Sequence, residues 1–307
     1  MTNEEQYLAT FRSIDFDSIA EHPNILIAAR FWDEERYRAA KVCYKFMRLI
    51  DDMIDDHKAA NKKINGKERK EFADNVNKWL NVLLDKRSDS PMQEELQDTI
   101  RRFRIPSWPM EAFAKSMLYD VFNTGFQSMQ TFIEYSQGAS VAPASIFVHL
   151  AGLRENNGSY DEPPYDVRKT ATPCAIFSYL VHIMRDFRKD QLNNLNYFAF
   201  DIMARNGLTH TKLNNIAHGA PITSGFRNMM NEYYTLADEY RLETVMAMKE
   251  IFPLITPQYR LSFEIIFELY LMVFERIDIA HGTFSTEELN PTPAEIKDRV
   301  LKVIMRQ

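Results

Sequence analysis

The sequence has little glycine and little cysteine. Nine glycines in 307 residues fall well below the ~7% share of an ordinary protein, whereas the helix-favouring residues Leu, Met, Glu, Lys, Arg and Ala are plentiful. The two cysteines, Cys43 and Cys174, belong to no CxxC or Cys/His cluster, so a disulfide framework or a structural zinc site has no support. We therefore expect an all-α fold and a reducing compartment.

Long apolar runs, a signal segment and an excess of basic charge are also missing. No stretch approaches about 18 consecutive apolar residues, and the acidic start MTNEEQYLATF lacks a basic region followed by an apolar core. The 37 basic and 43 acidic residues are dispersed along the chain and give a net charge of −6. The sequence therefore has no excess of basic residues that would indicate binding to a nucleic acid. We expect a cytoplasmic protein without a membrane span or a nucleic-acid partner.

The C-terminal residues 296–307, IKDRVLKVIMRQ, are weakly amphipathic. This pattern is compatible with peripheral contact with a membrane surface and with the packing of a last helix against the rest of the fold. We favour packing, because one short amphipathic segment is more often a docked helix.

Apolar residues recur at helical spacing through most of the chain. In residues 71–86, the side chains of Phe72, Val76, Trp79 and Leu83 lie three or four positions apart and predict an amphipathic surface helix. Similar spacing predicts helices over residues 33–57, 109–136, 166–190, 225–251 and 257–281. No stretch alternates strictly, so we predict no strand. Polar or proline-rich loops are predicted at residues 57–70, 86–93, 104–110, 154–166, 218–225 and 287–295. None resembles an interdomain linker, and we predict one helical domain over residues 1–307.

Small residues gather at positions 138–142, directly before Pro143, inside an otherwise helical pattern. Proline removes a helical hydrogen bond and clashes with the preceding turn, so a kinked or broken helix is expected there. Two interpretations stay open at this point. The segment either forms a kink that lines a substrate channel or lets two helices cross closely.

Carboxylates crowd the segment 41–58, KVCYKFMRLIDDMIDDHK. Asp51 and Asp55 lie four residues apart and project from one helix face, and Asp52 and Asp56 form a second such pair. The four carboxylates repel one another unless a cation is present, and such oxygen ligands suit Mg²⁺ that is shared with the phosphates of a substrate. The alternative is an acidic helix face in contact with solvent. The apolar residues between the carboxylates favour burial nearby.

Helical spacing places Tyr44 and Arg48 on the same stripe as Asp51 and Asp55. A phenol and a cation are therefore expected to face the same cavity as the carboxylates.

A second segment, SYLVHIMRDFRKD at residues 178–190, repeats this arrangement. Asp186 and Asp190 lie four residues apart beside Arg185, and Tyr179 and His182 continue their stripe. Two helices that each present such a pair can hold metal ions between them across the core of a bundle. The alternative is that Arg185 or a neighbouring arginine pairs with these carboxylates and no metal is bound.

The two segments together resemble a known family. Y-x-x-x-R-x-x-D-D-x-x-D at residues 44–55, followed about 130 residues later by R-D-x-x-x-D at residues 185–190, is similar to the paired aspartate motifs of squalene, dehydrosqualene and phytoene synthases. Further similarity lies in ERYRAAKVCY, in LNYFAFDIMARNGL, in ELYLMVFERID and at Tyr135. The resemblance covers about residues 20–280.

This resemblance implies a helical bundle of the isoprenoid or terpene synthase type with a central substrate channel. It implies that Asp51, Asp55, Asp186 and Asp190 bind Mg²⁺, which bridges two prenyl diphosphates. The other side chains that it places against substrate are Tyr44, Arg48, Asp52, Tyr135, Tyr179, His182, Arg185, Tyr197 and Tyr270. Among these, the arginines would steady diphosphate oxygens, and Tyr44, Tyr135, Tyr197 and Tyr270 would lie near the ionising allylic carbon.

Several positions depart from the family pattern. Relatives usually carry Gln and Asn where this chain has Tyr179 and His182, and their R-x-Y-x-P element appears here with only Tyr197 retained. HPNIL replaces their H-S-x-S-F-type start, and Lys189 replaces an acidic residue. For His182, contact with diphosphate and the role of a satisfied helix histidine both stay open, since Mg²⁺ itself prefers oxygen.

Three functions are consistent with these residues. The first is the head-to-head condensation of two farnesyl or geranylgeranyl diphosphates through a cyclopropyl diphosphate to a squalene- or phytoene-type product. The second is a related ionisation that ends in terpene cyclisation or hydrolysis. The third is a non-catalytic binding or assembly protein, which the retention of all four carboxylates disfavours. NADPH use stays open, because no Gly-rich dinucleotide motif is present.

Overall fold

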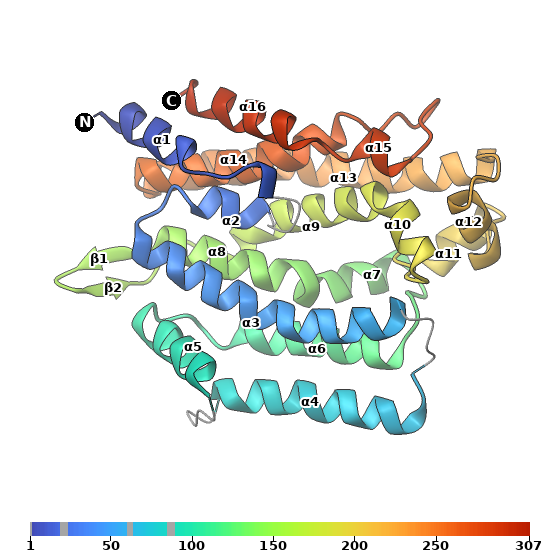
Figure 1. Cartoon of the computed structure of the whole chain (residues 1–307), viewed down its shortest axis with the longest axis horizontal. Helices are drawn as coiled ribbons and strands as arrows, with labels where there is room; N and C mark the ends of the chain where they lie inside the picture. The colour runs from blue at the N-terminus through green and yellow to red at the C-terminus, as the bar shows by residue number, and fades with distance from the viewer. Residues whose placement is uncertain (1, 19–23, 60–63, 85–89) are drawn as a thin grey trace.

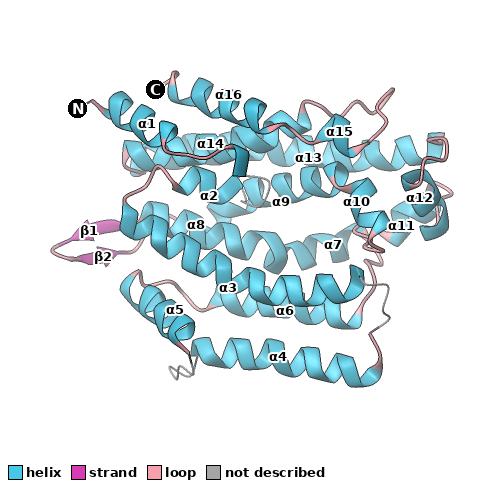
Figure 2. Ribbon diagram, viewed as in Figure 1, coloured by secondary structure: helices cyan, strands magenta, loops and turns pink. Residues whose placement is uncertain are grey.

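Most helices lie along the long axis of the molecule, in several layers (Figures 1 and 2). The structure is a computed structural model that describes residues 2–18, 24–59, 64–84 and 90–307. The helices that precede the hairpin are α1 Asn3–Arg12, α2 Asn24–Ala29, α3 Glu34–Ala59, α4 Gly66–Leu84, α5 Pro91–Arg102, α6 Trp108–Phe122, α7 Met129–Ser136, the π-helical turn η2 Gln137–Val141 and α8 Ala142–Gly152. After the strands β1 Arg154–Asn156 and β2 Ser159–Asp161 come α9 Val167–Arg185, α10 Phe187–Leu192, α11 Phe200–Arg205, α12 His210–Ala217, α13 Ser224–Ile251, η3 Phe252–Leu254, α14 Pro257–Phe274, α15 Thr286–Leu289 and α16 Pro293–Ile304. The prediction of an all-α fold is confirmed.

Side-chain caps begin several of the long helices at the predicted loops. The carboxylate of Asp166 accepts a hydrogen bond from the backbone N–H of Lys169 at the start of α9, and Thr223 caps α13 in the same way. Thr292 and Glu295 form a reciprocal capping box at the start of α16. Each cap satisfies backbone donors that a helix start leaves unpaired.

The predicted helices at 33–57 and 225–251 are confirmed as α3 and α13. The surface helix predicted around Trp79 is α4, and its indole N–H donates to the carbonyl of Phe46 at 3.1 Å and so holds α4 against α3. The predicted loops at 57–70 and 86–93, and the HPNIL start, fall partly on residues outside the described ranges.

Three predicted helices are shorter or broken. The helix over 109–136 is interrupted between Phe122 and Ser128, where Ser128 caps α7 by accepting from the N–H of Thr131. The helix over 166–190 breaks at Asp186 into α9 and α10. The helix over 257–281 ends at Phe274, and an Asx turn follows, in which Asp278 accepts the backbone N–H groups of the next residues.

The prediction that the chain contains no strand is wrong at residues 154–161. Strands β1 and β2 pair antiparallel across a two-residue turn, in which Asn157 (φ 49°) and Gly158 (φ 79°) take left-handed conformations. Asn-Gly is the commonest sequence for such a turn. This Asn-Gly turn sequence lies within the predicted loop, but the two strands are too short to show an alternation of apolar and polar residues.

The segment of small residues crosses another helix closely and also lines a cavity. A Cβ at Gly138 would lie 2.0 Å from the carbonyl oxygen of Ala112, so only glycine lets the π-helical turn cross α6 this closely. Ala139, Ser140 and Pro143 on the same segment line the large cavity described below.

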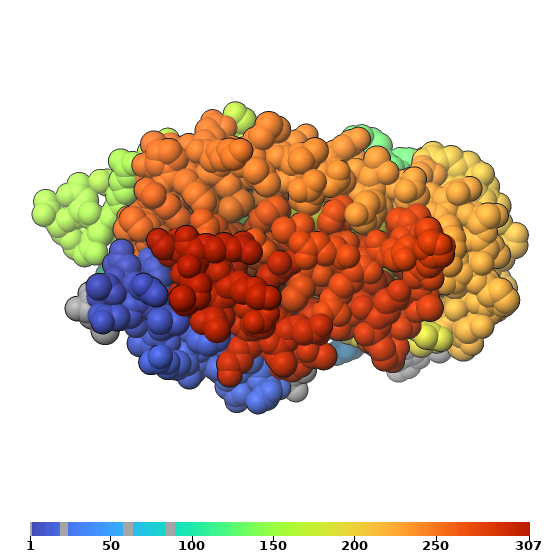
Figure 3. All heavy atoms as spheres, turned by 90° about the horizontal axis from the view of Figure 1, so that it is seen from above, coloured from blue at the N-terminus to red at the C-terminus, as the bar shows by residue number. Residues whose placement is uncertain are grey.

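The termini lie side by side, because α1 packs against α16 and α16 against α14 (Figures 1 and 3). Ile296, Val300 and Val303 of the last helix are buried, which confirms the predicted packing of the C-terminal segment. Among the helices in the described part of the chain, none has both the length and the apolarity needed to cross a bilayer.

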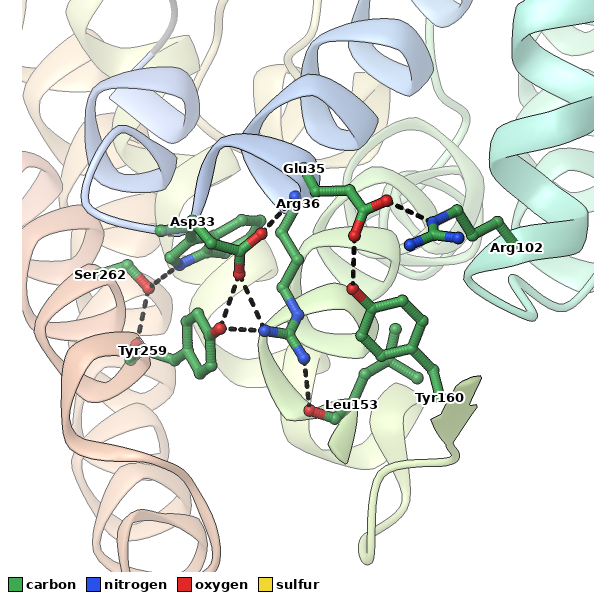
Figure 4. A network of polar contacts seen from close by, with 9 residues as sticks. Asp33, Glu35, Arg36, Arg102, Leu153, Tyr160, Tyr259 and Ser262 are labelled. Carbon is green, nitrogen blue, oxygen red and sulfur yellow. Dashed lines mark hydrogen bonds and ion pairs between the residues drawn. The ribbon is translucent and has the colours of Figure 1, made fainter. Parts of the chain in front are cut away.

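A buried arginine ties the start of α3 to three other elements (Figure 4). Arg36 pairs with Asp33 at 2.9 Å, donates to the carbonyl of Leu153 at 2.9 Å and contacts the hydroxyl of Tyr259 on α14. Its guanidinium also lies 5.0 Å from the ring centre of Tyr160 on β2. Because burying a charge is costly unless it is paired, these contacts hold the elements in one arrangement.

We expect Arg36→Met to lower the free energy of unfolding by about 2–3 kcal/mol. Removing one partner of a fully buried ion pair typically lowers the free energy of unfolding by about 3–5 kcal/mol. The loss should be smaller here, because the Asp33 side chain is 39% exposed and water can solvate its carboxylate. Urea unfolding measures this change. The matched control is Arg101→Met, because Arg101 forms the same i,i+3 pair with Asp98 on an exposed surface and should cost no more than about 0.5 kcal/mol. Equal losses in the two variants would contradict the prediction.

Candidate active site

A cavity of ≈610 Å³ runs through the bundle between α3, α8, α9, α13 and α14. All the site residues predicted from the sequence line this cavity: Tyr44, Arg48, Asp51, Asp52, Asp55, Tyr135, Tyr179, His182, Arg185, Asp186, Asp190, Tyr197 and Tyr270. The structure therefore brings the two aspartate segments together at one site. The roles assigned to these residues remain predictions.

The cavity is polar at one end and apolar along the rest of its length. It follows α3 from Ala40 to Asp56, a helical span of about 24 Å. The carboxylates lie at the polar end, and the far walls carry Phe147 from α8, Ile251 from α13 and Phe263 from α14. Such a shape suits a long apolar molecule with an anionic head.

On α3, Arg48 already has carboxylate partners. Its guanidinium pairs with Asp51 at 2.6 Å and also with Asp52. The Arg48 and Asp52 side chains are both half-exposed, so these pairs are weak and can be exchanged for other anionic partners. Burial raises the pKa of the Tyr44 phenol, one turn before Arg48.

On α9, the break at Asp186 turns its carboxylate toward two donors. Arg185 holds it through two hydrogen bonds, Nε to Oδ1 at 2.7 Å and Nη2 to Oδ2 at 2.8 Å, and His182 Nε2 lies 2.8 Å from Oδ2. Burial acts to raise the pKa of Asp186, but the hydrogen bonds from Arg185 and His182 overcome it and hold this pKa well below its usual range.

The structure settles which arginine pairs with the second aspartate segment. Arg185 does, whereas Arg188 donates to the carbonyl of Ala217 at 2.8 Å. For His182, the structure shows a half-exposed ring that lines the cavity and is paired with Asp186.

Asp190 lies one turn after Asp186, and within the described residues no arginine or histidine pairs with its carboxylate as Arg185 and His182 do with that of Asp186. Burial raises its pKa to about 8, and the charges of Asp186 and of Asp55 on α3 add to this effect. Asp55 and Asp190 line the same cavity, so the two helices present their carboxylates to a common space. At neutral pH this end of the cavity carries more negative charge than its arginines neutralise, so it favours a bound proton or a cation.

The donor set fits magnesium shared with a substrate. Within the described residues, no group of three His, Cys, Asp or Glu side chains is arranged to hold a metal ion by itself. Mg²⁺ commonly takes one or two carboxylates and completes its coordination with phosphate oxygens and water. The carboxylates of α3 lie on one side of the cavity, and those at the junction of α9 and α10 lie on the other. Both sets can supply the one or two protein ligands that such an ion needs.

Tyrosines form the wall beside the carboxylates. The ring centres of Tyr135 and Tyr179 lie 6.4 Å apart, and those of Tyr179 and Tyr197 lie 6.3 Å apart. Burial raises the pKa of all three phenols well above the usual value, and nearby carboxylates raise it further. Tyr270 on α14 is also kept neutral by burial. The wall therefore presents uncharged aromatic faces, which can stabilise a nearby cation.

Sequence reasoning missed Asp120 and the apolar part of the cavity. Asp120 on α6 accepts a hydrogen bond of 2.5 Å from the hydroxyl of Tyr135, yet it stands in no carboxylate pair and follows no motif. The residues at the apolar end have ordinary helical spacing, which does not separate a cavity wall from a filled core.

The raised pKa of Asp190 predicts how the metal-free protein responds to pH. The pKa of Asp190 is about 8 in the folded state and 3.8 in the unfolded state, so between these values the folded state holds a proton that the unfolded state has released. The stability that this group contributes is complete below about pH 4 and is lost as the pH rises through about 8. We expect the Tm of the wild type to fall between pH 6 and 9, and Asp190→Asn to remove much of this slope. A slope unchanged in Asp190→Asn would contradict the assignment, and Asp74→Asn, on the exposed face of α4, is the control.

The comparisons with known proteins agree with this geometry. A family model described as "Squalene/phytoene synthase" matches residues 21–294. A search of curated protein sequences finds no match.

Solved structures show the same fold at low sequence identity. The chain resembles a dehydrosqualene synthase in complex with ligand, with a TM-score of 0.68, 16% identity and 100% of both chains covered. Squalene synthase HpnC from Alicyclobacillus acidocaldarius has a TM-score of 0.61 and 14% identity, over 87% of this chain and 96% of that one. YisP from Bacillus subtilis subsp. subtilis strain 168 has a TM-score of 0.62 and 14% identity, over 97% and 96%. The predicted bundle of the isoprenoid synthase type is thereby confirmed.

Proposed function

We propose that this chain, which belongs to the squalene/phytoene synthase family, is a magnesium-dependent prenyltransferase. It would join two prenyl diphosphates head to head and release diphosphate. One observation carries the proposal. Two carboxylate pairs, on α3 and at the junction of α9 and α10, meet at the polar end of a long apolar cavity. The substrates would be farnesyl or geranylgeranyl diphosphate, joined through a cyclopropyl diphosphate to a squalene- or phytoene-type product.

The polar end would bind the diphosphates. Asp51 and Asp55 from α3 and Asp186 and Asp190 from the opposite side would hold magnesium, which neutralises the charge that develops on the leaving diphosphate. Arg48 can exchange its exposed carboxylate partners for diphosphate oxygens. Lys189 lines the same end and adds positive charge.

The rest of the cavity would control the cation that forms when the diphosphate leaves. Its apolar walls exclude water, which would otherwise capture the cation. The neutral rings of Tyr135, Tyr179 and Tyr197 face the region next to the carboxylates and stabilise positive charge through their π faces. Arg185 keeps Asp186 ionised and correctly oriented throughout.

The second candidate is a cyclase or hydrolase that acts on one prenyl diphosphate. The cavity of ≈610 Å³ favours it, because sites for single small ligands span about 300–1,000 Å³. His182 occupies a position where relatives usually carry Asn, which also supports a divergent outcome. A non-catalytic assembly role is disfavoured, because Asp186 is held as a charged group inside the cavity with Asp190 one turn away, where an inactive relative has no need of either carboxyl group.

Product analysis tests these alternatives. The protein is incubated with farnesyl or geranylgeranyl diphosphate and Mg²⁺, with and without NADPH, and products are identified by mass spectrometry. We expect Mg²⁺-dependent release of diphosphate and a condensed hydrocarbon. A cyclic or hydroxylated product from one chain would favour the second candidate, and no release from any prenyl diphosphate would overturn both enzymatic proposals.

Asp51→Asn and Asp186→Asn should each lower turnover at least about 10²-fold and leave the fold intact. Each removes a charged ligand of the shared cation rather than a packing group. Steady-state release of diphosphate measures the loss. Asp74→Asn removes a carboxylate from the exposed face of α4 and should behave as the wild type. Normal turnover with an unchanged Mg²⁺ requirement in either cavity variant would refute the assignment.

His182 gives a graded prediction. His182→Ala removes one hydrogen bond to the charged Asp186, typically about 1.5–3 kcal/mol, and turnover should fall about tenfold to a hundredfold. In His182→Asn, a carboxamide N–H can donate to the same carboxylate, so turnover should stay within about threefold of the wild type. A larger loss in His182→Asn would show that the imidazole itself acts on the substrate.

A further inference from the structure

Asp120 connects the tyrosine wall to a second cavity. It lies near the end of α6, and its Oδ2 accepts the 2.5 Å hydrogen bond from the hydroxyl of Tyr135 at the end of α7. O–H···O bonds this short are typical of an ionised acceptor. Tyr135 lines the large cavity, whereas Asp120 does not.

The second cavity, of ≈210 Å³, lies on the other side of this contact. Asp120 lines it together with Arg69, Gly125 and Asn196. Leu195 and Tyr197 line both cavities and so form the wall between them. The bond from Tyr135 to Asp120 therefore connects the large cavity with the second cavity.

Other phenol–carboxylate bonds in the described residues lack this placement. Tyr160 donates to Glu35 and Tyr259 to Asp33, but neither tyrosine lines the large cavity. Those bonds belong to the network around Arg36. The bond of Tyr135 instead begins beside Tyr179 and Tyr197, where the proposed reaction forms its cation.

We infer that Asp120 is a positioning residue that acts through Tyr135 and takes up the proton released when the carbocation collapses. This inference rests on the proposed function. A C–H bond beside the cationic carbon breaks, and its electron pair forms the new carbon–carbon bond or double bond. The proton passes to the phenol oxygen of Tyr135 as the proton of that phenol passes to Asp120. Charge balances, since one carbocation and one carboxylate become two neutral groups.

Burial keeps the phenol of Tyr135 neutral, so Tyr135 is not present as a phenolate that could accept the proton. A neutral phenol is also too weak a base to keep an added proton. Tyr135 can therefore accept a proton only if it gives its own proton to another group at the same time. Asp120 receives that proton at the second cavity. The carboxylates at the polar end would instead bind the magnesium that holds the diphosphates.

The test compares Asp120→Asn, Tyr135→Phe and the double variant in single-turnover reactions with farnesyl or geranylgeranyl diphosphate and Mg²⁺. Each single variant should lower the rate constant of product formation about 10²-fold, the usual contribution of a positioned proton acceptor, with little change in KM. The double variant should be no slower than the singles, because the two residues act as one unit. The wild type should show a solvent deuterium isotope effect on this step, and both single variants should lose it.

The matched control is Tyr119→Phe. The ring of Tyr119 belongs to the same aromatic cluster, 5.5 Å from Tyr135 between ring centres, but its hydroxyl donates to the carbonyl of Gly125 at 2.8 Å and Tyr119 does not line the large cavity. It should keep the rate and the isotope effect of the wild type.

The outcomes separate the two proposals. Unchanged rates and isotope effects in Asp120→Asn would show that another base, such as the released diphosphate, takes the proton, and would overturn the relay alone. Losses that add in the double variant, with the isotope effect intact, would show a packing role and overturn it as well. A wild type that releases no diphosphate would overturn the proposed function and the relay together.

Discussion

The burial of several carboxylates at one end of an apolar cavity is the constraint on which the rest of the structure depends. Asp186 is 7% exposed and stays ionised through Arg185 and His182, while burial, together with the charges of Asp186 and Asp55, raises the pKa of Asp190 one turn later. Taking such groups out of water is unfavourable unless a partner neutralises them. The arrangement is therefore incomplete by itself and suits a cation that arrives with an anionic substrate.

The helices around the cavity keep this unfavourable arrangement in place. Helix α9 packs against α8, α13 and α14, and its buried apolar side chains continue to Met184, directly before Arg185 and Asp186. The glycine crossing of η2 on α6 and the network around Arg36 fix the opposite walls. A site that must hold like charges close together needs rigid walls, because a flexible one would relieve the repulsion by moving apart.

In the proposed reaction, the polar and aromatic parts of the cavity have different roles. The carboxylates would hold magnesium, which together with the arginines would neutralise the leaving diphosphate. The neutral phenols lie next to them, where positive charge would appear, and Asp120 lies behind Tyr135 on the far side of the wall. In the proposed relay, this separation would keep the carboxylate of Asp120 from capturing the carbocation directly.

The sequence by itself determined the helical class, the position of most helices and the two carboxylate pairs, because these follow from local spacing at three or four residues. Only the tertiary structure decided that α9 ends at Asp186, that Arg185 rather than Arg188 pairs with it, and that Asp120 meets Tyr135 from another helix. It also decided that residues 154–161 form a hairpin. These features depend on contacts between segments distant in the chain or on single backbone conformations, and neither leaves a periodic signal in the sequence.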